Sequence, residues 1–371
     1  MTVLDFLYYA FAVVVSVQVI CYLFIYGRFA FAKPKKGNTQ NIQPVSVIVY
    51  AKNEAEMLKS FLPTILSQNY PNYEVVLIND VSYDNTFEIM EDFAEKHSNI
   101  KLVNVKNNEA FWGNKKYALT LGIKAATNEN LLFIEASSKP TTSNWIKELN
   151  SQISDSKTII IGYGAYTKVK NSILNKLIRF ENLVKAIQYM SFAKSGIPFT
   201  GVGTNLAYTK KQFFDANGFM SHMNIKKVDH ALFINQTATK KNTSVVFSKD
   251  SFTTTQAKNT FKDWVLLNRQ DTFISKHYKF IHKTLLSLIY CSSLLFWILG
   301  TLLISLSFNW QIVSAIIAVK LVVQYIVYGT SAKKLNELDL LFFVPFFEIF
   351  LILFQFVIFI TNTSSKPKHW K

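Results

Sequence analysis

Three short groups of polar and acidic residues each follow an apolar run in the first half of the chain. They are Lys52-Asn53-Glu54, Asn79-Asp80-Val81-Ser82 and Glu135-Ala136-Ser137-Ser138. Short apolar runs bounded by polar residues are typical of buried parallel strands, and α/β sheets bind ligands beyond the carboxyl ends of their strands. The three groups therefore predict a ligand site built from carboxylates, amides and hydroxyls.

The sequence lacks the motifs of several other chemistries. No GxGxxG follows the first run, which disfavours a dinucleotide-binding fold, and no GxxxxGK[ST] occurs, which argues against a P-loop. The six histidines and two cysteines show no Ser-His-Asp, Cys-His or metal-ligand spacing. His230 is the one histidine near the predicted chemistry, where it either tunes the neighbouring Asp229 or lies exposed on a helix.

An alternation of strands and helices between residues 44 and 270 positions these groups. Short strands that alternate with amphipathic helices predict a parallel sheet in an α/β domain. The spacing of apolar residues predicts strands over 45–51, 73–78, 100–105 and 130–135, and helices over 56–68, 85–96 and 115–126.

Four segments resemble family-2 glycosyltransferases of the GT-A fold. PVSVIVYAKNEAEMLKSFLPTILSQNYPNYEVVLINDVSYDNT resembles their opening βαβ unit, and GNKKYALTLGIKAATNENLLFIEASSKPTTSNWI their next helix, strand and metal-motif region. GVGTNLAYTKKQFFDANGF and VDHALFINQ resemble the acceptor-side and base-bearing segments. The segments follow the family's order, so the resemblance implies a GT-A nucleotide-sugar-binding domain over 44–272, with a Rossmann-like, mostly parallel sheet and flanking helices.

The resemblance implies inverting transfer of a sugar from a nucleotide-sugar donor to a glycan or lipid-linked acceptor. A carboxylate base takes the acceptor proton, Mg²⁺ or Mn²⁺ neutralises the diphosphate, and a pocket holds the nucleoside. Position by position, Asp229 matches the general base, with a helix N-cap as its alternative role. The residues that match nucleotide-sugar-binding positions are Asn53, Glu54, Asp80, Asp84, Lys115, Glu135 and Ser137.

Two of these residues have simpler roles that the sequence leaves open. Asp84 is expected either beside the nucleotide or as the cap of the helix that begins near Asn85. Lys115 is expected either to contact phosphate or to lie on a solvated helix face.

The chain departs from the family at its chemical positions. The metal motif Asp-x-Asp reads Glu135-Ala136-Ser137, so Glu135 is the remaining candidate metal ligand; hard cations favour anionic oxygens over the Ser137 hydroxyl. The Gln-x-x-Arg-Trp motif retains only Arg269, one position early, which either clamps diphosphate or acceptor or flanks a membrane segment. Two interpretations follow: a transferase with weakened or metal-independent donor binding, or an inactive partner of another membrane glycosyltransferase in a polysaccharide or glycolipid pathway.

The whole chain is both hydrophobic and basic, which is rare in soluble domains. It has 371 residues, 50% of them hydrophobic, a mean hydropathy of +0.16 and a net charge of +16. About 20 apolar residues span a bilayer, and four blocks approach that length. They predict an N-terminal anchor over 4–27 and two or three C-terminal spans over 284–362. The apolar blocks are Phe6–Tyr26, Leu285–Phe308, Ile312–Tyr328 and Leu340–Ile360.

Basic flanks predict the orientation of these blocks. Lysines and arginines follow the first block and precede the second, so we expect the α/β domain in the cytoplasm, at a bacterial inner membrane. With four spans, the C-terminal lysines Lys366, Lys368 and Lys371 would lie outside the cell, against that rule. Pro345 instead suggests that the fourth block is an interfacial or re-entrant element. Lys320 and Glu348 lie inside apolar blocks and should face protein or water, either along a lipid-acceptor path or by snorkelling or helix pairing.

The positive charge fits an anionic membrane surface and a diphosphate donor. The basic residues are scattered and mostly lysine, with no aromatic nucleic-acid-binding motif, which excludes a nucleic-acid partner.

Overall fold

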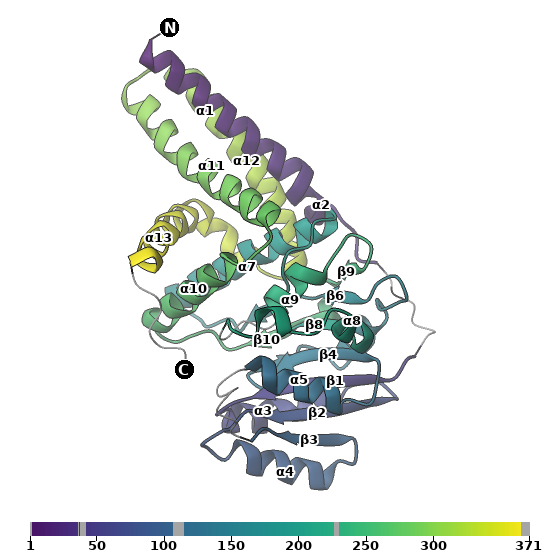
Figure 1. The fold of residues 1–371 in the computed structure, drawn as a ribbon. Coiled ribbons are helices and arrows are strands. Elements are labelled where there is room, and N and C mark those ends of the chain that lie inside the picture. Colours follow the sequence, from purple (N-terminus) through teal and green to yellow (C-terminus); the bar gives the residue numbers. More distant parts are fainter. Residues whose placement is uncertain (1, 36, 38–41, 107–114, 226–229, 365–371) are drawn as a thin grey trace. The chain divides into compact units, whose positions relative to one another are not determined.

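The computed structural model describes residues 2–35, 37, 42–106, 115–225 and 230–364 (Figure 1). Within these limits the chain divides into two compact units. The α/β unit comprises residues 34–170 and 196–258, and the helical unit comprises residues 2–33, 171–195 and 259–364. Residues 171–195 and 259–272, inside the predicted domain range 44–272, thus group with the helical unit.

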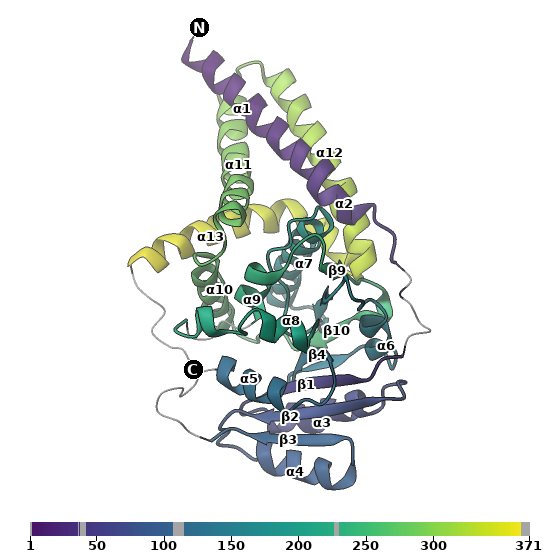
Figure 2. The ribbon, with the colours of Figure 1, turned by 45° about the vertical axis from the view of Figure 1, so that its right-hand side comes forward.

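A seven-stranded sheet forms the centre of the α/β unit, in the order β3-β2-β1-β4-β8-β6-β9 (Figure 2). The first four strands are parallel, β8 runs antiparallel to β4 and β6, and β9 is parallel to β6. The prediction of a mostly parallel α/β sheet is confirmed. The strands are β1 (Val45–Ala51), β2 (Tyr73–Asn79), β3 (Ile100–Asn104), β4 (Asn130–Glu135), β6 (Ile159–Ile161), β8 (Leu206–Thr209) and β9 (Thr243–Val245).

A smaller sheet has the order β5-β10-β7, with β5 (Ser138–Pro140) directly after the end of β4. The other two strands are β7 (Gly164–Tyr166) and β10 (Thr253–Thr255). The helices of the unit are α3 (Ala55–Leu66), α4 (Thr86–Lys96), α5 (Lys115–Ala125), α6 (Trp145–Asn150), α8 (Lys210–Asp215) and α9 (His230–Thr237). The predicted strands and helices agree with these bounds to within two residues.

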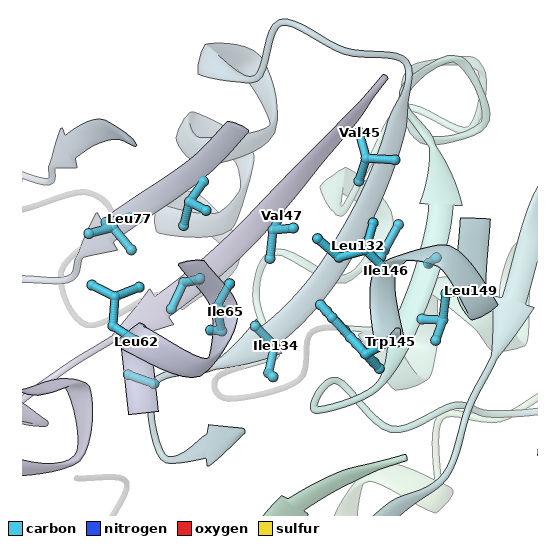
Figure 3. Close-up of a cluster of buried hydrophobic side chains, with 14 of the residues drawn as sticks. Val45, Val47, Leu62, Ile65, Leu77, Leu132, Ile134, Trp145, Ile146 and Leu149 are labelled. Atoms are coloured by element: carbon cyan, nitrogen blue, oxygen red, sulfur yellow. The ribbon is translucent and has the colours of Figure 1, made fainter. Parts of the chain in front are cut away.

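The core of the unit lies between the sheet and helices α3 and α6 (Figure 3). Alternate residues of β1 and β4 point toward these helices, because successive side chains of a strand face opposite sides. Fully buried side chains of the cluster include Val45, Val47, Leu62, Ile65, Leu77, Leu132, Ile134, Trp145, Ile146 and Leu149. This packing fixes the carboxyl ends of β1, β2 and β4.

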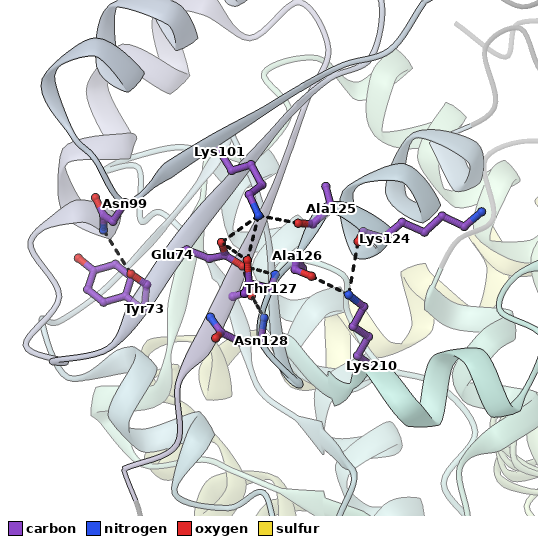
Figure 4. Close-up of polar contacts among 11 residues, drawn as sticks. Tyr73, Glu74, Asn99, Lys101, Lys124, Ala125, Ala126, Thr127, Asn128 and Lys210 are labelled. Carbon is purple, nitrogen blue, oxygen red and sulfur yellow. Dashed lines mark hydrogen bonds and ion pairs between the residues drawn. The ribbon is translucent and has the colours of Figure 1, made fainter.

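Glu74, at the start of β2, ties three segments together at the opposite end of the strands (Figure 4). Its carboxylate accepts hydrogen bonds from Ser46 Oγ (2.6 Å) and Thr127 N (2.5 Å), and Lys101 Nζ lies 3.5 Å away. Burial raises the pKa of Glu74, but these hydrogen bonds and the lysine charge outweigh it, so the pKa lies below its ordinary value. The charged form therefore stabilises the fold.

Replacing Glu74 by glutamine is expected to reduce the free energy of unfolding by about 2 kcal/mol, the usual value of a hydrogen bond to a charged group. Because the folded pKa is depressed, this contribution is complete above the unfolded pKa and is lost as the pH falls through the folded one. Thermal unfolding of the purified chain at pH 7 and pH 3 measures both effects. The exposed Glu95→Gln is the matched control, and equal stability of Glu74→Gln and wild type at pH 7 would contradict the assignment.

The helical unit contains all four predicted apolar blocks. Four stretches are long and apolar enough to cross a membrane: Val3–Ala30, Phe280–Ser305, Trp310–Leu335 and Leu338–Ser364. The first combines α1 (Val3–Ile20), the π-helical turn η1 (Cys21–Tyr26) and α2 (Gly27–Ala30). The others are α11 (Phe280–Ser305), α12 (Trp310–Leu335), and η5 (Leu338–Phe343) with α13 (Val344–Ser364); the polar helices α7 (Ile173–Lys194) and α10 (Phe261–Ser275) complete the unit.

Helices α1, α11 and α12 pack on one another through aromatic and aliphatic side chains. Phe11 of α1 stacks on Phe296 of α11 at 6.0 Å between ring centroids. Lys320 of α12 is fully buried and donates to Gln324 Oε1 (2.7 Å) and Glu348 Oε1 (3.4 Å). The expectation that Lys320 and Glu348 face protein is confirmed, and their contacts are those of helix pairing.

Candidate active site

The strand ends that carry the predicted polar groups lie at one edge of the main sheet. Ala51 of β1 is level with Asn79 of β2, and Tyr50 of β1 is level with Glu135 of β4. The residues that follow these positions must therefore share this edge. This register agrees with the prediction that the three polar groups follow the carboxyl ends of strands in one sheet.

Asp80 lies at the centre of this edge, and its side chain is buried. It is 3% exposed and accepts a hydrogen bond from the Tyr50 hydroxyl at 2.6 Å, while Lys52 Nζ lies 3.6 Å away. Burial raises the pKa of Tyr50, and the negative charge of Asp80 raises it further, so Tyr50 stays protonated and donates. Tyr50 holds Asp80 in place, a role that sequence reasoning missed.

Lys115, the first residue of α5, reaches the same edge. Its ammonium group lies 2.5 Å from Glu135 Oε1 and 4.8 Å from the centroid of the Tyr50 ring. The Lys115 side chain is 19% exposed and that of Glu135 is 33% exposed, so both reach solvent. Lys115 is therefore paired with Glu135 and is not on a fully solvated helix face, and its contact with phosphate stays a prediction.

The loop after β1 and the loop after β2 are joined by hydrogen bonds. Asn53 adopts a positive φ of 55°, which asparagine tolerates, and its Oδ1 accepts from Tyr83 N at 2.8 Å. Asp84 accepts from Ala55 N (3.2 Å) and Thr86 N (3.1 Å), so it binds the first residue of α3 and of α4. Asn53 and Asp84 therefore shape the loops of the site.

Glu54 follows Asn53 and adds a second carboxylate close to Glu135. Burial raises the pKa of Glu54, and the charge of Glu135 raises it further. The negative charges of Glu54 and Glu135 repel each other, and the ammonium group of Lys115 lies directly against Glu135.

The residues of the metal-motif region do not fit a divalent metal site. Glu135 is paired with Lys115, and Ser137 lies in the turn between β4 and β5 with a neutral hydroxyl. Among the described residues no group of three or more His, Cys, Asp and Glu side chains could hold a metal ion. Hard cations need several anionic or carbonyl oxygens, and here the Glu135 carboxylate is already paired with the Lys115 ammonium group.

Lys116, next to Lys115, has a different role that sequence reasoning missed. It is 1% exposed, and its ammonium group donates to the backbone oxygens of His222 and Ile225. It thus fixes the segment that leads to residues 226–229. Asp229, the predicted base, lies outside the described residues.

His230 begins α9 and is 2% exposed, against the expectation that it lies exposed on a helix. Its ring packs on Phe133 at 4.7 Å between centroids, and Nδ1 lies 3.4 Å from the Tyr208 hydroxyl. The expectation was wrong because aromatic residues of β4 and β8 surround the helix start.

Arg269 belongs to α10 of the helical unit. Its Nε donates to Asn362 Oδ1 at 3.0 Å, and Asn362 Nδ2 donates to the Arg269 carbonyl at 3.0 Å. Its role toward diphosphate or acceptor stays a prediction.

Part of the chain matches a known family and known proteins. Residues 46–214 match the family profile described as glycosyl transferase family 2. The chain is 36% identical over 101 residues to the poly-β-1,6-N-acetyl-D-glucosamine synthase of Staphylococcus epidermidis, covering 27% of this chain and 23% of that protein. It is 33% identical over 115 residues to the 4,4′-diaponeurosporenoate glycosyltransferase of Staphylococcus haemolyticus, covering 31% and 30%. The matched part thus spans less than a third of either relative.

A solved structure shares the fold. The mannosyltransferase PcManGT from Pyrobaculum calidifontis, in complex with GDP-Man and Mn²⁺, superposes with a TM-score of 0.59 at 15% identity, over 94% of this chain and 99% of that chain. The sequence match supplies the family and this likeness supplies the fold. Residues 46–214 therefore match glycosyl transferase family 2, and the chain has the GT-A fold that its four ordered segments predict.

Proposed function

We propose that this chain is a membrane-bound glycosyltransferase that moves a sugar, with inversion, from a nucleotide-sugar to a glycan or lipid-linked acceptor. The observation that carries the proposal is the position of Lys115, between Glu135 and Tyr50 at the carboxyl edge of the sheet. Ligands bind at this edge in α/β folds, and an ammonium group there suits a diphosphate. Asn53, Glu54 and Asp80 border the same edge and would hold the nucleoside.

The reaction is a single displacement at the anomeric carbon. The acceptor oxygen forms the new bond as the bond to the diphosphate oxygen breaks, and the nucleoside diphosphate leaves with the bonding electrons. Asp229 takes the acceptor proton as general base. Lys115 stabilises the charge that develops on the diphosphate.

Donor binding in this proposal does not depend on a divalent metal. Lys115 supplies positive charge beside Glu135, and Ser137 leaves the metal motif with one carboxylate. Exchanging Mg²⁺ or Mn²⁺ for EDTA is therefore expected to change donor affinity less than about threefold, below the tenfold effect of 1.4 kcal/mol. Ser137→Asp adds the missing carboxylate and is expected to make binding metal-dependent, and the same side-chain change at the exposed Ser156 is the control.

Titrating the purified full chain with UDP-, GDP- and dTDP-sugars, each with metal and with EDTA, tests both statements. We expect at least one donor to bind in both conditions. Binding that requires metal in the wild type would contradict metal independence, and failure of every donor to bind would contradict the transferase proposal.

The second candidate is an inactive partner of another membrane glycosyltransferase. The observation that favours it is the same metal-motif region, where Ser137 is neutral and Glu135 is engaged by Lys115. This candidate predicts no turnover with any donor and stable co-purification with a second transferase. Turnover by the chain alone would exclude it.

The proposed location is a cell membrane, with the α/β unit in the cytoplasm. The four apolar stretches of the helical unit support membrane insertion. The basic residues beside them support the orientation, because cytoplasmic flanks of membrane helices are enriched in lysine and arginine.

A further inference from the structure

Both ends of α13 are attached to cations of the polar helices α7 and α10. Before the helix begins, Arg179 of α7 binds Glu337 and also contacts Asp339 at 2.8 Å. Near its last turn, Arg269 of α10 and Asn362 exchange two hydrogen bonds. The two ends therefore lie against the same polar layer.

Between its two ends, α13 also packs against α7 and α10. Phe347 packs on Phe180 of α7 at 5.5 Å, and Phe354 stacks on Trp264 of α10 at 4.3 Å between ring centroids. Only one hydrogen bond joins α13 to α11 among the described contacts, from the Tyr290 hydroxyl to the Ile352 carbonyl. Figures 1 and 2 show α13 lying across α11 and not along it.

Charged residues run through the layer that covers α13. Glu181 of α7 accepts from Trp264 Nε1 at 2.5 Å, and Lys185 bridges Glu181 (2.9 Å) and Asp271 of α10 (2.7 Å). If α13 crossed the bilayer, this network and Arg269 would enter the hydrocarbon beside it. Ionised side chains there are costly and rare, which argues against a spanning α13.

The opposite face of α13 is apolar and exposed over its whole length. None of the exposed side chains of α13 is charged, and exposed apolar side chains recur on this face at helical spacing: Phe346, Ile349, Leu353, Phe356, Val357 and Ile360. The polar half of the assembly comes from α7 and α10 instead of from α13 itself. This face fits the acyl-chain boundary of a membrane.

We propose that α13 lies in the plane of the membrane, with both ends on one side and its exposed apolar face bound to lipid. The chain then crosses the membrane three times, by Val3–Ala30, α11 and α12. Three crossings keep the tail lysines on the side of Lys333 and Lys334, as the positive-inside rule requires. Pro345 stands in the first turn of α13, where a helix tolerates proline, directly after the 3-10 helix η5 ends at Phe343.

Spin-label depth measurements on the full chain in lipid bilayers test this placement. Cys21 and Cys291 are first replaced by serine, and single cysteines are placed at Phe346, Leu353 and Ile360. The matched control uses the exposed positions Ile312, Val319 and Ile326 of α12, which have the same seven-residue spacing. Accessibility to oxygen and to a water-soluble nickel complex reports the depth of each label.

An in-plane α13 predicts equal depths for its three labels, while seven residues of a spanning helix change the depth by about 10 Å. The α12 labels should show such a change, from one membrane surface toward the other. A depth change along α13 equal to that along α12 would overturn the proposal. The inference rests on the proposed membrane location and not on the reaction; if the α12 labels too show no lipid exposure, the membrane location itself fails.

Labelling from outside the cell provides an independent test. With a membrane-impermeant maleimide, Ser364→Cys and Lys333→Cys should both react only after the membrane is permeabilised. Ser307→Cys, in the turn between α11 and α12, should react in intact cells. Reaction of Ser364→Cys in the pattern of Ser307→Cys would show a fourth crossing.

Discussion

Replacement of Asp229 by asparagine is expected to lower turnover roughly a thousandfold while donor affinity stays within about twofold of wild type, because a general base contributes 10²–10⁴-fold. The amide keeps the size of the side chain but cannot accept the proton of the acceptor hydroxyl. The donor contacts proposed for Asn53, Asp80 and Lys115 do not involve it. The loss should therefore appear in kcat and not in donor binding.

The control for this variant is Asp215→Asn, the same change at an exposed residue of α8 that pairs with Lys211. It is expected to leave kcat unchanged. Turnover of Asp229→Asn within about tenfold of wild type would remove Asp229 as the base. If Asp229→Asn loses both donor binding and turnover, Asp229 instead has a role in holding the donor.

Replacement of Lys115 by methionine is expected to weaken donor binding by about 10- to 100-fold. A hydrogen bond to a charged group contributes about 1.5–3 kcal/mol, and 1.4 kcal/mol is a factor of ten. Methionine has similar length and removes the charge, and it leaves Glu135 unpaired and facing the diphosphate. We expect the upper end of the range because carboxylate and diphosphate repel each other.

Lys124→Met is the matched control, since Lys124 is an exposed lysine of the same helix α5. Titration of both variants with the donor that binds wild type, without metal, measures the difference. Equal affinities of Lys115→Met and Lys124→Met would contradict the role of Lys115. A weakened Lys115→Met that Mg²⁺ restores would indicate a metal at the site and so contradict metal independence.

The strands of the site could be predicted because each one is a short apolar run that ends at a polar group. Val45–Ala51 and Asn130–Glu135 are predicted to the residue, since buried parallel strands leave a continuous apolar pattern. The register that brings Tyr50 level with Glu135 depends on pairing between distant segments, which a local pattern does not contain.

Tyr50 and Lys116 were missed for related physical reasons. From the sequence alone, Tyr50 is expected to be a core residue of the strand. The feature that sets it apart is its hydroxyl group, one position before the strand ends. Lys116 reads as a surface helix residue, because a buried lysine becomes visible only when the carbonyl groups that accept its hydrogen bonds are known. His230 was placed wrongly for the same reason, since its aromatic neighbours come from β4 and β8.

The fourth apolar block shows the limit of hydropathy most clearly. Length and composition make Leu338–Ser364 equivalent to the other three stretches. The residues that distinguish it, Arg179 and Arg269, lie far away in the sequence on helices that are themselves polar. A hydropathy window measures what a segment contains and not which partners cover it.

Release of nucleoside diphosphate by the purified full chain from UDP-, GDP- and dTDP-sugars, in the presence of EDTA, is the most direct measurement of the proposed transfer. We expect release from at least one donor, faster with a suitable acceptor, and its loss in Asp229→Asn. No release from any donor by a chain that is folded and membrane-inserted, with or without metal, would contradict the proposed transfer.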